Sequence, residues 1–315
     1  MKKLLFALAW VWGTALADYP ERPVRLVVPF APGGGTDLTS RLISQHLSES
    51  LGKPVVVENR AGAAGNIGTE AVARAPADGH TLVLASLSTA VNVSLFKKLP
   101  FNPLTDFAPV SLIVTVPLLV VVHPSLPVSN IQELIQLARA KPGQLNYASG
   151  GLGTANHVGG ELFKYMANVQ IVHVPYKGGG SALGDVAGGH VPLFFGTMTS
   201  TRDLVKSGRL RALATTTTAR SPSWPHPPTV AESGVPGFEV SAWFGVLAPA
   251  GTPGPIVARL SGELIKMVRT REVREGLLAQ GSDLVGSTPE EFGRHLRSEI
   301  DKWSKVVQAS GLRAD

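Results

Sequence analysis

The stretch Phe30-Ala31-Pro32-Gly33-Gly34-Gly35-Thr36-Asp37 decides how this chain is interpreted, because it joins two segments of different periodicity. Residues 24–29 before it form an apolar run that predicts a buried strand, and leucines at helical spacing after it predict a helix over residues 37–50. Glycines at the end of a strand let a ligand approach the backbone, and the first helical turn offers unpaired N–H groups that can hold an anion. The alternative is an ordinary tight turn in which Thr36 or Asp37 caps the helix.

The beginning of the chain has the three parts of a secretory signal. Lys2 and Lys3 follow the initial methionine and are basic, residues 4–12 are apolar, and Ala15-Leu16-Ala17 is a small-x-small cleavage sequence. The apolar run is too short to span a bilayer. We therefore predict that residues 1–17 are a signal peptide and that the mature protein is periplasmic. The alternative is an ordinary buried first helix.

Composition excludes several classes of function. The chain has no cysteine, so it has no disulfide, thiol nucleophile or cysteine metal site. Its net charge is +6, or +4 without Lys2 and Lys3, and no basic block with interleaved aromatic residues suggests a nucleic-acid partner. The eight histidines are scattered without an H-E-x-x-H motif, so no metal is expected. The remaining residues, about 298, suggest two domains.

Predicted strands and helices alternate along the chain. The strands are expected at residues 24–29, 55–58, 81–85, 109–122, 145–148, 170–175, 191–195, 209–214 and 240–248. The helices are expected at residues 37–50, 65–74, 129–140, 154–167, 181–187, 201–206, 255–269, 272–280 and 289–309. This alternation predicts an α/β fold of mostly parallel sheets flanked by helices. Two crossings of the chain predict a discontinuous lobe I, residues 18–122 plus 245–315, and a lobe II, residues 123–244.

The common enzyme fingerprints fail. There is no phosphate-binding G-x-x-x-x-G-K-[ST] motif, and Gly33-Gly34-Gly35 lacks the later glycine of a dinucleotide fingerprint. There is no G-x-S-x-G nucleophile elbow either. Ser149, His157 and Asp185 are able to form a hydrolytic triad in principle, but nothing in their spacing requires one.

Four turns rich in glycine and small hydroxyl residues stand out instead. They lie at residues 31–37, 62–68, 149–157 and 175–181, and Ser86 and Thr89 follow a further strand. Together they place hydroxyls and free N–H groups at the carboxyl ends of several strands, where open α/β sheets bind ligands. Because the turns come from both predicted lobes, we expect a cleft between the lobes.

Residues 22–37, RPVRLVVPFAPGGGTD, resemble the opening of the Bug (TctC-like) family, the extracytoplasmic solute receptors of tripartite tricarboxylate transport systems. The resemblance continues through residues 55–60, 62–68, 76–82, 147–149, 173–178, 208–214, 228–232 and 247–253. It implies a two-lobed, type II periplasmic-binding-protein fold that closes over a small carboxylate: a dicarboxylate, tricarboxylate, acidic amino acid or aromatic acid. The identity of the acid is not implied, since the family varies near residues 87–93 and 152–156.

The resemblance also implies which turns hold the solute. Backbone N–H groups and waters at residues 30–36 and 149–157 are expected to hold the carboxylate, and Ser86 and Thr89 to contact its far end. Asp185 is expected to orient an amino or hydroxyl group of the ligand, or to cap a helix. The full expected set is Phe30, Ala31, Gly33, Gly34, Thr36, Asp37, Ser86, Thr89, Ser149, Gly150, Gly153, Thr154, Asn156, His157, Tyr176 and Asp185.

The expected function is that of an exported solute-binding protein without catalysis, cofactor or metal. Ligand contacts with both lobes would favour a closed state, which membrane permease subunits would then recognise. The protein is expected to act as a monomer. Two alternatives remain at this stage: a sensory receptor that passes ligand occupancy to a signalling partner, and a hydrolase that uses Ser149 and His157.

Overall fold

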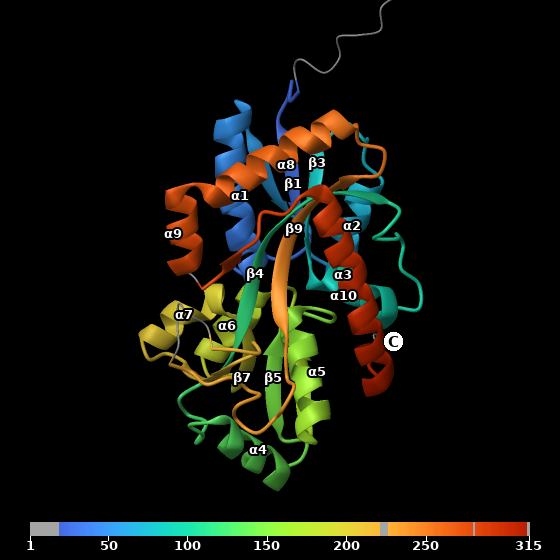
Figure 1. The fold of residues 1–315 in the computed structure, drawn as a ribbon. Helices are drawn as coiled ribbons and strands as arrows, with labels where there is room; N and C mark the ends of the chain where they lie inside the picture. The colour runs from blue at the N-terminus through green and yellow to red at the C-terminus, as the bar shows by residue number, and fades with distance from the viewer. Residues whose placement is uncertain (1–18, 221–225, 280, 314–315) are drawn as a thin grey trace, which may run out of the picture.

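Strand β4 (Phe107–Val122) crosses the middle of the molecule and belongs to both of its sheets (Figure 1). Its first part pairs with β9 (Ser241–Pro249), and its last five residues pair with β7 (Leu193–Thr197). Most of its sixteen residues are buried, which is typical of an apolar strand covered on both faces. We use lobe I for the sheet that contains β9 and lobe II for the sheet that contains β7, each with its helices.

The computed structural model describes residues 19–220, 226–279 and 281–313. The predicted signal peptide, residues 1–17, lies outside the described residues. Among the helices that are described, none is both long and apolar enough to cross a membrane.

The sheet of lobe I has the order β2-β1-β3-β9-β4. Strands β1 (Val24–Val28), β2 (Val55–Asn59) and β3 (Thr81–Ser86) are parallel, with Val24 opposite Val55. Strand β9 is antiparallel to both β3 and β4, and the short β10 (Asp283–Leu284) pairs with β4. The glycine-rich stretch after β1 therefore lies at the carboxyl edge of the parallel strands.

The sheet of lobe II repeats this plan. Strands β5 (Leu145–Ser149), β6 (Ile171–Pro175) and β7 are parallel, and β4 and β8 (Arg211–Thr215) complete the sheet. The carboxyl ends of β5 and β7 point toward lobe I in Figure 1, so the turns that follow them face the turns that follow β1 and β3.

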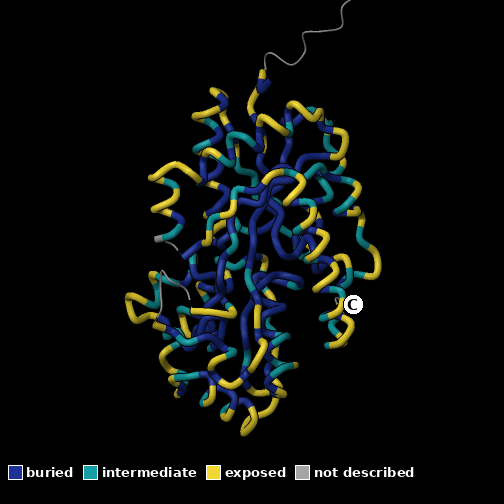
Figure 2. The backbone as a smooth tube through the Cα atoms, viewed as in Figure 1, coloured by how far each residue is buried: buried dark blue, intermediate teal, exposed yellow. Residues whose placement is uncertain are grey.

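Helices cover both sheets, which accounts for the complete burial of β3 and β7. In lobe I these are α1 (Gly35–Leu51), α2 (Asn66–Ala73) after a short 3₁₀ turn (Ala63–Gly65), α3 (Leu87–Leu95), α8 (Gly254–Arg269), α9 (Arg271–Ala279) and α10 (Pro289–Ser310). In lobe II they are α4 (Ile131–Ala140), α5 (Ala155–Ala167), α6 (Gly179–Ala187) and α7 (Met198–Lys206). Figure 2 shows the buried backbone following the two sheets continuously from one lobe to the other.

Helix α10 packs its apolar stripe beside the crossing strands. Phe292 is fully buried against Gly245 of β9, where any side chain would collide with its ring. Further along the helix, a carboxylate oxygen of Glu299 accepts the indole N–H groups of Trp243 at 3.0 Å and of Trp303 at 3.2 Å. Glu299 thereby ties the helix to β9 at the point where the chain passes between the lobes.

The alternation of strands and helices predicted from the sequence is confirmed, with two differences. The strands are parallel only in the outer three of each sheet, because β4 and β9 cross between the lobes in opposite directions. Helix α3 and the two-residue strand β10 were not predicted. The residues of α3 are mostly β-branched, serine or threonine and have low intrinsic helix propensity. The assignment of residues 18–122 plus 245–315 and of residues 123–244 to separate lobes stays a prediction.

Candidate functional site

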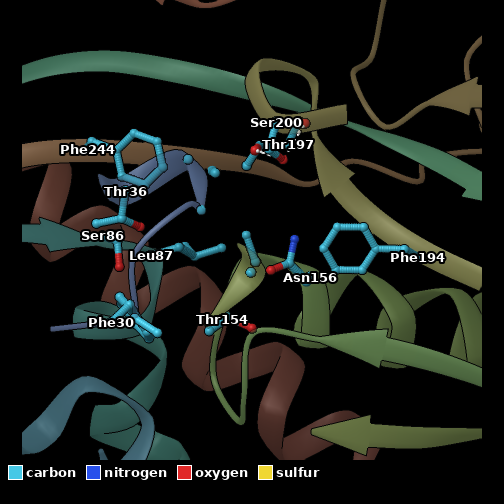
Figure 3. Close-up of a pocket in the computed structure, with 16 residues that line it drawn as sticks. Phe30, Thr36, Ser86, Leu87, Thr154, Asn156, Phe194, Thr197, Ser200 and Phe244 are labelled. Carbon is cyan, nitrogen blue, oxygen red and sulfur yellow. Dashed lines mark hydrogen bonds between the residues drawn. The ribbon is translucent and has the colours of Figure 1, made fainter. Parts of the chain in front are cut away.

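A cavity lies between the two lobes at the carboxyl ends of their strands (Figure 3). Its volume is about 50 Å³, room for a few water molecules, so the lobes lie close together around it. Sixteen residues from both lobes line it: Phe30, Ala31, Gly34, Gly35, Thr36, Ser86, Leu87, Thr154, Ala155, Asn156, Gly179, Phe194, Thr197, Ser200, Ala242 and Phe244.

Five helices of the described chain begin at this cavity. Helices α1, α3 and α5 contribute their N-cap residues Gly34, Ser86 and Thr154 to its wall. Helix α7 contributes its N-cap Thr197, and α6 contributes its first residue, Gly179. Each helix start carries a partial positive charge and N–H groups without partners inside the helix. The cavity therefore has a field that favours an anion.

Three of these five helix starts are left open by the side chains described here. Helix α3 has a capping box made by Ser86 and Thr89, and Thr154 caps α5. Helices α1, α6 and α7, which begin after Gly34, Gly178 and Thr197, have no side-chain cap in the described structure. Their amide groups are the ones that an anionic ligand is able to use.

The cavity wall itself is uncharged. None of its sixteen described lining residues is acidic or basic. Its polar part consists of hydroxyls and the amide of Asn156, whose Nδ2 donates to the Phe195 carbonyl at 2.6 Å. Its apolar part includes the rings of Phe30, Phe194 and Phe244 (Figure 3). The wall suits a ligand with an anionic end and an apolar body.

The lobes touch beside the cavity through bare backbone. The Ala31 N–H of lobe I donates to the Lys177 carbonyl of lobe II at 3.1 Å. A Cβ built on Gly34 would lie 3.4 Å from the amide nitrogens of both Gly179 and Gly180. The contact depends on glycine because a larger side chain at Gly34 would push the two backbones apart.

The first loop at the cavity, residues 30–34, is held by a charged side chain. The buried carboxylate of Asp37 accepts the Gly33 N–H at 3.1 Å, and Gly33 has a φ of 87°, in the left-handed region that favours glycine. The same carboxylate accepts two N–H groups of Arg41, at 3.0 and 3.2 Å, and the amide of Asn59 at 3.1 Å. Burial acts to raise the pKa of Asp37, but these hydrogen bonds outweigh it and lower the pKa.

The second loop, residues 149–154, is held by neutral side chains. The Gly153 N–H donates to Nδ1 of His157 at 3.1 Å, and the Ser149 hydroxyl lies 2.6 Å from Nε2 of His173. The ring centroids of His157 and His173 are 4.3 Å apart. Burial, followed by the charges of His173 and Lys164, lowers the pKa of His157 to about 3. Burial also lowers the pKa of His173 to about 4, so both rings are neutral at physiological pH.

Seven of the sixteen residues predicted to bind ligand line the cavity: Phe30, Ala31, Gly34, Thr36, Ser86, Thr154 and Asn156. Gly33, Asp37, Ser149, Gly150, Gly153 and His157 belong to the two loops and their supports but are not among the lining residues. Thr89 is in the capping box of α3, and Tyr176 donates to Asp185 at 2.6 Å. A direct role in ligand binding stays a prediction for all of them.

Other lining residues were missed. Thr197 ends β7, Ser200 follows it, and Gly179 lies within the glycine turn at residues 175–181, so their hydroxyl and glycine content was a usable signal. Phe194 and Phe244 lie inside apolar strands, and nothing in the sequence distinguishes them from core residues.

The structure does not assemble the triad considered from the sequence. Ser149 pairs with His173 rather than His157, its side chain is fully buried, and Asp185 pairs with Tyr176. Among the described residues, no group of three or more histidine, aspartate and glutamate side chains is arranged to hold a metal ion.

Comparisons with known proteins identify the family of this chain. Residues 39–312 match the profile described as "Tripartite tricarboxylate transporter family receptor". The chain is 40% identical over 313 residues to Protein BugT of Bordetella pertussis, covering 98% of this chain and 96% of BugT.

Two solved structures show the same fold. A structure described as R. palustris Rpa4515 with adipate is 41% identical, has a TM-score of 0.91, and is matched over 93% of this chain and 99% of its own. MatC of Rhodopseudomonas palustris with bound malate is 33% identical, has a TM-score of 0.88, and is matched over 92% and 100%. The chain thus has the α/β fold of periplasmic binding proteins, and it belongs to the TctC (Bug) family of non-enzymatic solute receptors of tripartite tricarboxylate transporters.

Proposed function

We propose that this protein is a periplasmic receptor that captures a small carboxylate with an apolar body and delivers it to membrane permease subunits. The observation that carries the proposal is the convergence of five helix N-termini on one uncharged cavity between the lobes. The relatives with adipate and malate support a carboxylate as the ligand. The predicted signal peptide supports the location.

The anionic end of the solute is placed at the starts of α1 and α6. Their uncapped first turns meet where Gly34 approaches Gly179 and Gly180. A hydrogen bond to a charged group contributes about 1.5–3 kcal/mol. A few such bonds reach the roughly 8 kcal/mol of a micromolar complex.

The apolar body of the solute is placed against Phe30, Leu87, Phe194 of β7 and Phe244 of β9. A chain of methylene groups gains about 0.8 kcal/mol for each group that it buries there. A compact acid with several charges gains little from this wall and finds no cationic side chain among the described lining residues. We therefore expect adipate to bind more tightly than citrate.

The test is isothermal titration of the purified protein with adipate, malate, citrate and benzoate, and with hexanol as an uncharged control. Binding of at least one carboxylate, with citrate weaker than adipate and hexanol silent, supports the proposal. Native mass spectrometry of freshly purified protein identifies any retained solute. Failure of every acid to bind, or conversion of the acid into a product, would refute the proposal.

A further inference from the structure

We propose that His157 is a positioning residue for the second loop, and that it acts by keeping Nδ1 free of a proton so that this nitrogen accepts the Gly153 N–H. The idea rests on the proposed function in that the second loop faces the ligand. It assigns to an imidazole that is 3% exposed the task of fixing the backbone rather than touching the solute.

The first loop shows the same device with different chemistry. Gly33 and Gly153 each immediately precede the N-cap of a helix, and both have a positive φ, of 87° and 71°. Each donates its N–H, over 3.1 Å, to the side chain at the third residue of that helix, Asp37 in α1 and His157 in α5. Two independent loops that end in the same hydrogen bond indicate that the bond sets the loop shape.

The bond fixes the tautomer of His157. A neutral imidazole has one donor and one acceptor nitrogen. Because Nδ1 accepts from Gly153, the proton must be on Nε2. The Thr154 hydroxyl, which receives the His157 backbone N–H at 3.4 Å, also donates to the Gly151 carbonyl at 2.7 Å. One turn of helix therefore holds both Gly151 and Gly153 of the loop.

The second imidazole supports the first. His173 of β6 lies between the His157 ring, at 4.3 Å, and the Tyr147 ring of β5, at 5.1 Å. Its Nε2 lies 2.6 Å from the Ser149 hydroxyl, which accepts the Gly151 N–H at 3.0 Å. The His173 ring is thus connected to the start of the same loop that His157 holds at its end.

The charged groups around this pair lie on α5. Glu161 accepts the Tyr147 hydroxyl at 2.5 Å and pairs with Lys164 at 2.8 Å. Lys164 opposes a positive charge on either imidazole, whereas Glu161 favours one on His173. The low pKa of His157 keeps the acceptor nitrogen available throughout the neutral and mildly acidic range.

Two variants separate the acceptor from the ring. In His157→Asn the side-chain oxygen replaces Nδ1 on the same carbon, so the acceptor is kept and the ring is lost. In His157→Phe the ring packing against His173 is kept and the acceptor is lost. The first measurement is hydrogen exchange of the Gly153 amide in the ligand-free protein. We expect protection within threefold of wild type in the asparagine variant and exchange at least tenfold faster in the phenylalanine variant.

The second measurement is adipate affinity. We expect His157→Asn to bind within threefold of wild type and His157→Phe at least tenfold more weakly. Retained protection and affinity in the phenylalanine variant, or equal loss in both variants, would overturn the proposal. If wild type itself does not bind adipate, the proposed function fails for that solute, and Gly153 exchange still decides the role of His157.

The tautomer provides a readout in the unmodified protein. Nitrogen-15 chemical shifts of the imidazoles distinguish a bare nitrogen from a protonated one. A bare Nδ1 and a protonated Nε2 on His157 at pH 7 are the expected result. A proton on Nδ1 at that pH would overturn the proposal, even if neither variant folds.

Discussion

The first and second loops are held by the same kind of hydrogen bond, with a charged acceptor in the first and a neutral acceptor in the second. In lobe I a buried carboxylate receives the glycine N–H, and the half-exposed Arg41 compensates its charge. In lobe II a neutral imidazole receives the N–H, and the residue four positions later is Glu161, which is engaged by Tyr147 and Lys164. Both loops therefore have an acceptor at this position, and only the first has a charge there. We therefore expect the two loops to respond differently to substitution, to acid and to salt.

Giving the second loop the acceptor of the first is expected to change the unfolding free energy most. In His157→Asp a carboxylate enters a buried site beside Glu161 without an arginine to pair with it. An unpaired buried charge costs about 3–5 kcal/mol of unfolding free energy. Urea unfolding at pH 7 measures this loss. A destabilisation below 1 kcal/mol would show that the second loop tolerates charge as well as the first.

Acid should distinguish the two loops next. The unfolded state takes up a proton on His157 near its ordinary pKa of 6.5, whereas the folded state, with its pKa lowered to about 3, does not. Stability therefore falls as pH decreases from 6.5, by about 1.4 kcal/mol per pH unit for this group. Because folding lowers the pKa of Asp37, the ionised carboxylate stabilises the fold at pH values above the ordinary pKa of 3.8. This stabilisation is lost only as the pH falls below that value.

The measurement is urea unfolding at pH 6.5, 5.5 and 4.5 for wild type and His157→Asn. The unfolding free energy of the variant should fall less steeply with decreasing pH than that of wild type, because about one proton fewer is taken up on unfolding. Parallel declines in the two proteins would mean that His157 does not remain neutral in the fold.

The contact between the loops gives a third test. Gly34→Val places a branched side chain against the backbone of Gly179 and Gly180. We expect at least a tenfold loss of carboxylate affinity, about 1.4 kcal/mol, with little change in unfolding free energy of the ligand-free protein. Gly184→Val is the matched control, because a Cβ on Gly184 meets no atom within 4 Å. Normal binding by Gly34→Val would remove this contact from the mechanism.

The smallest effect is expected from neutralising the first loop. Asp37→Asn keeps an oxygen for Gly33 but loses the ion pair with Arg41, whose side chain is 58% exposed. This half-exposed pair contributes about 1 kcal/mol or less, and that contribution decreases with salt. The second acceptor oxygen, which is lost when an amide replaces the carboxylate, adds about 1 kcal/mol that salt does not change. Unfolding in 0.05 and 1 M salt checks this, with Glu275→Gln on the exposed Arg271–Glu275 pair of α9 as the control. A loss above 3 kcal/mol would contradict the comparison.

Most of the fold could be predicted from the sequence because its signals are local. Apolar runs located the strands. Helix α10 was located by its apolar stripe, the five buried residues Phe292, Leu296, Ile300, Trp303 and Val307. Strand direction is not local: the antiparallel course of β9 depends on where the chain crosses, which periodicity does not encode. Helix α3 was missed because its capping box and burial outweigh poor propensity.

The parts of the site that backbone turns form could be predicted from the sequence. The parts that side chains of strands form could not. The glycine turns identified Gly34 and Thr154 because strand-to-helix turns have a recognisable composition. Asp37 lies in the right turn, but its carboxylate is occupied by Gly33, Arg41 and Asn59, which only coordinates reveal. Likewise, the pairing of Ser149 with His173 brings together residues 24 positions apart through the register of β5 and β6.

The carboxylate of Glu299 shared by two indoles has a practical consequence. Trp243 belongs to a strand that crosses toward the other lobe, and Trp303 belongs to the helix packed beside it. Any rotation of the crossing strands alters the surroundings of both rings at once. We therefore expect the wavelength of tryptophan emission to report a rotation of β9 relative to α10 without an attached dye.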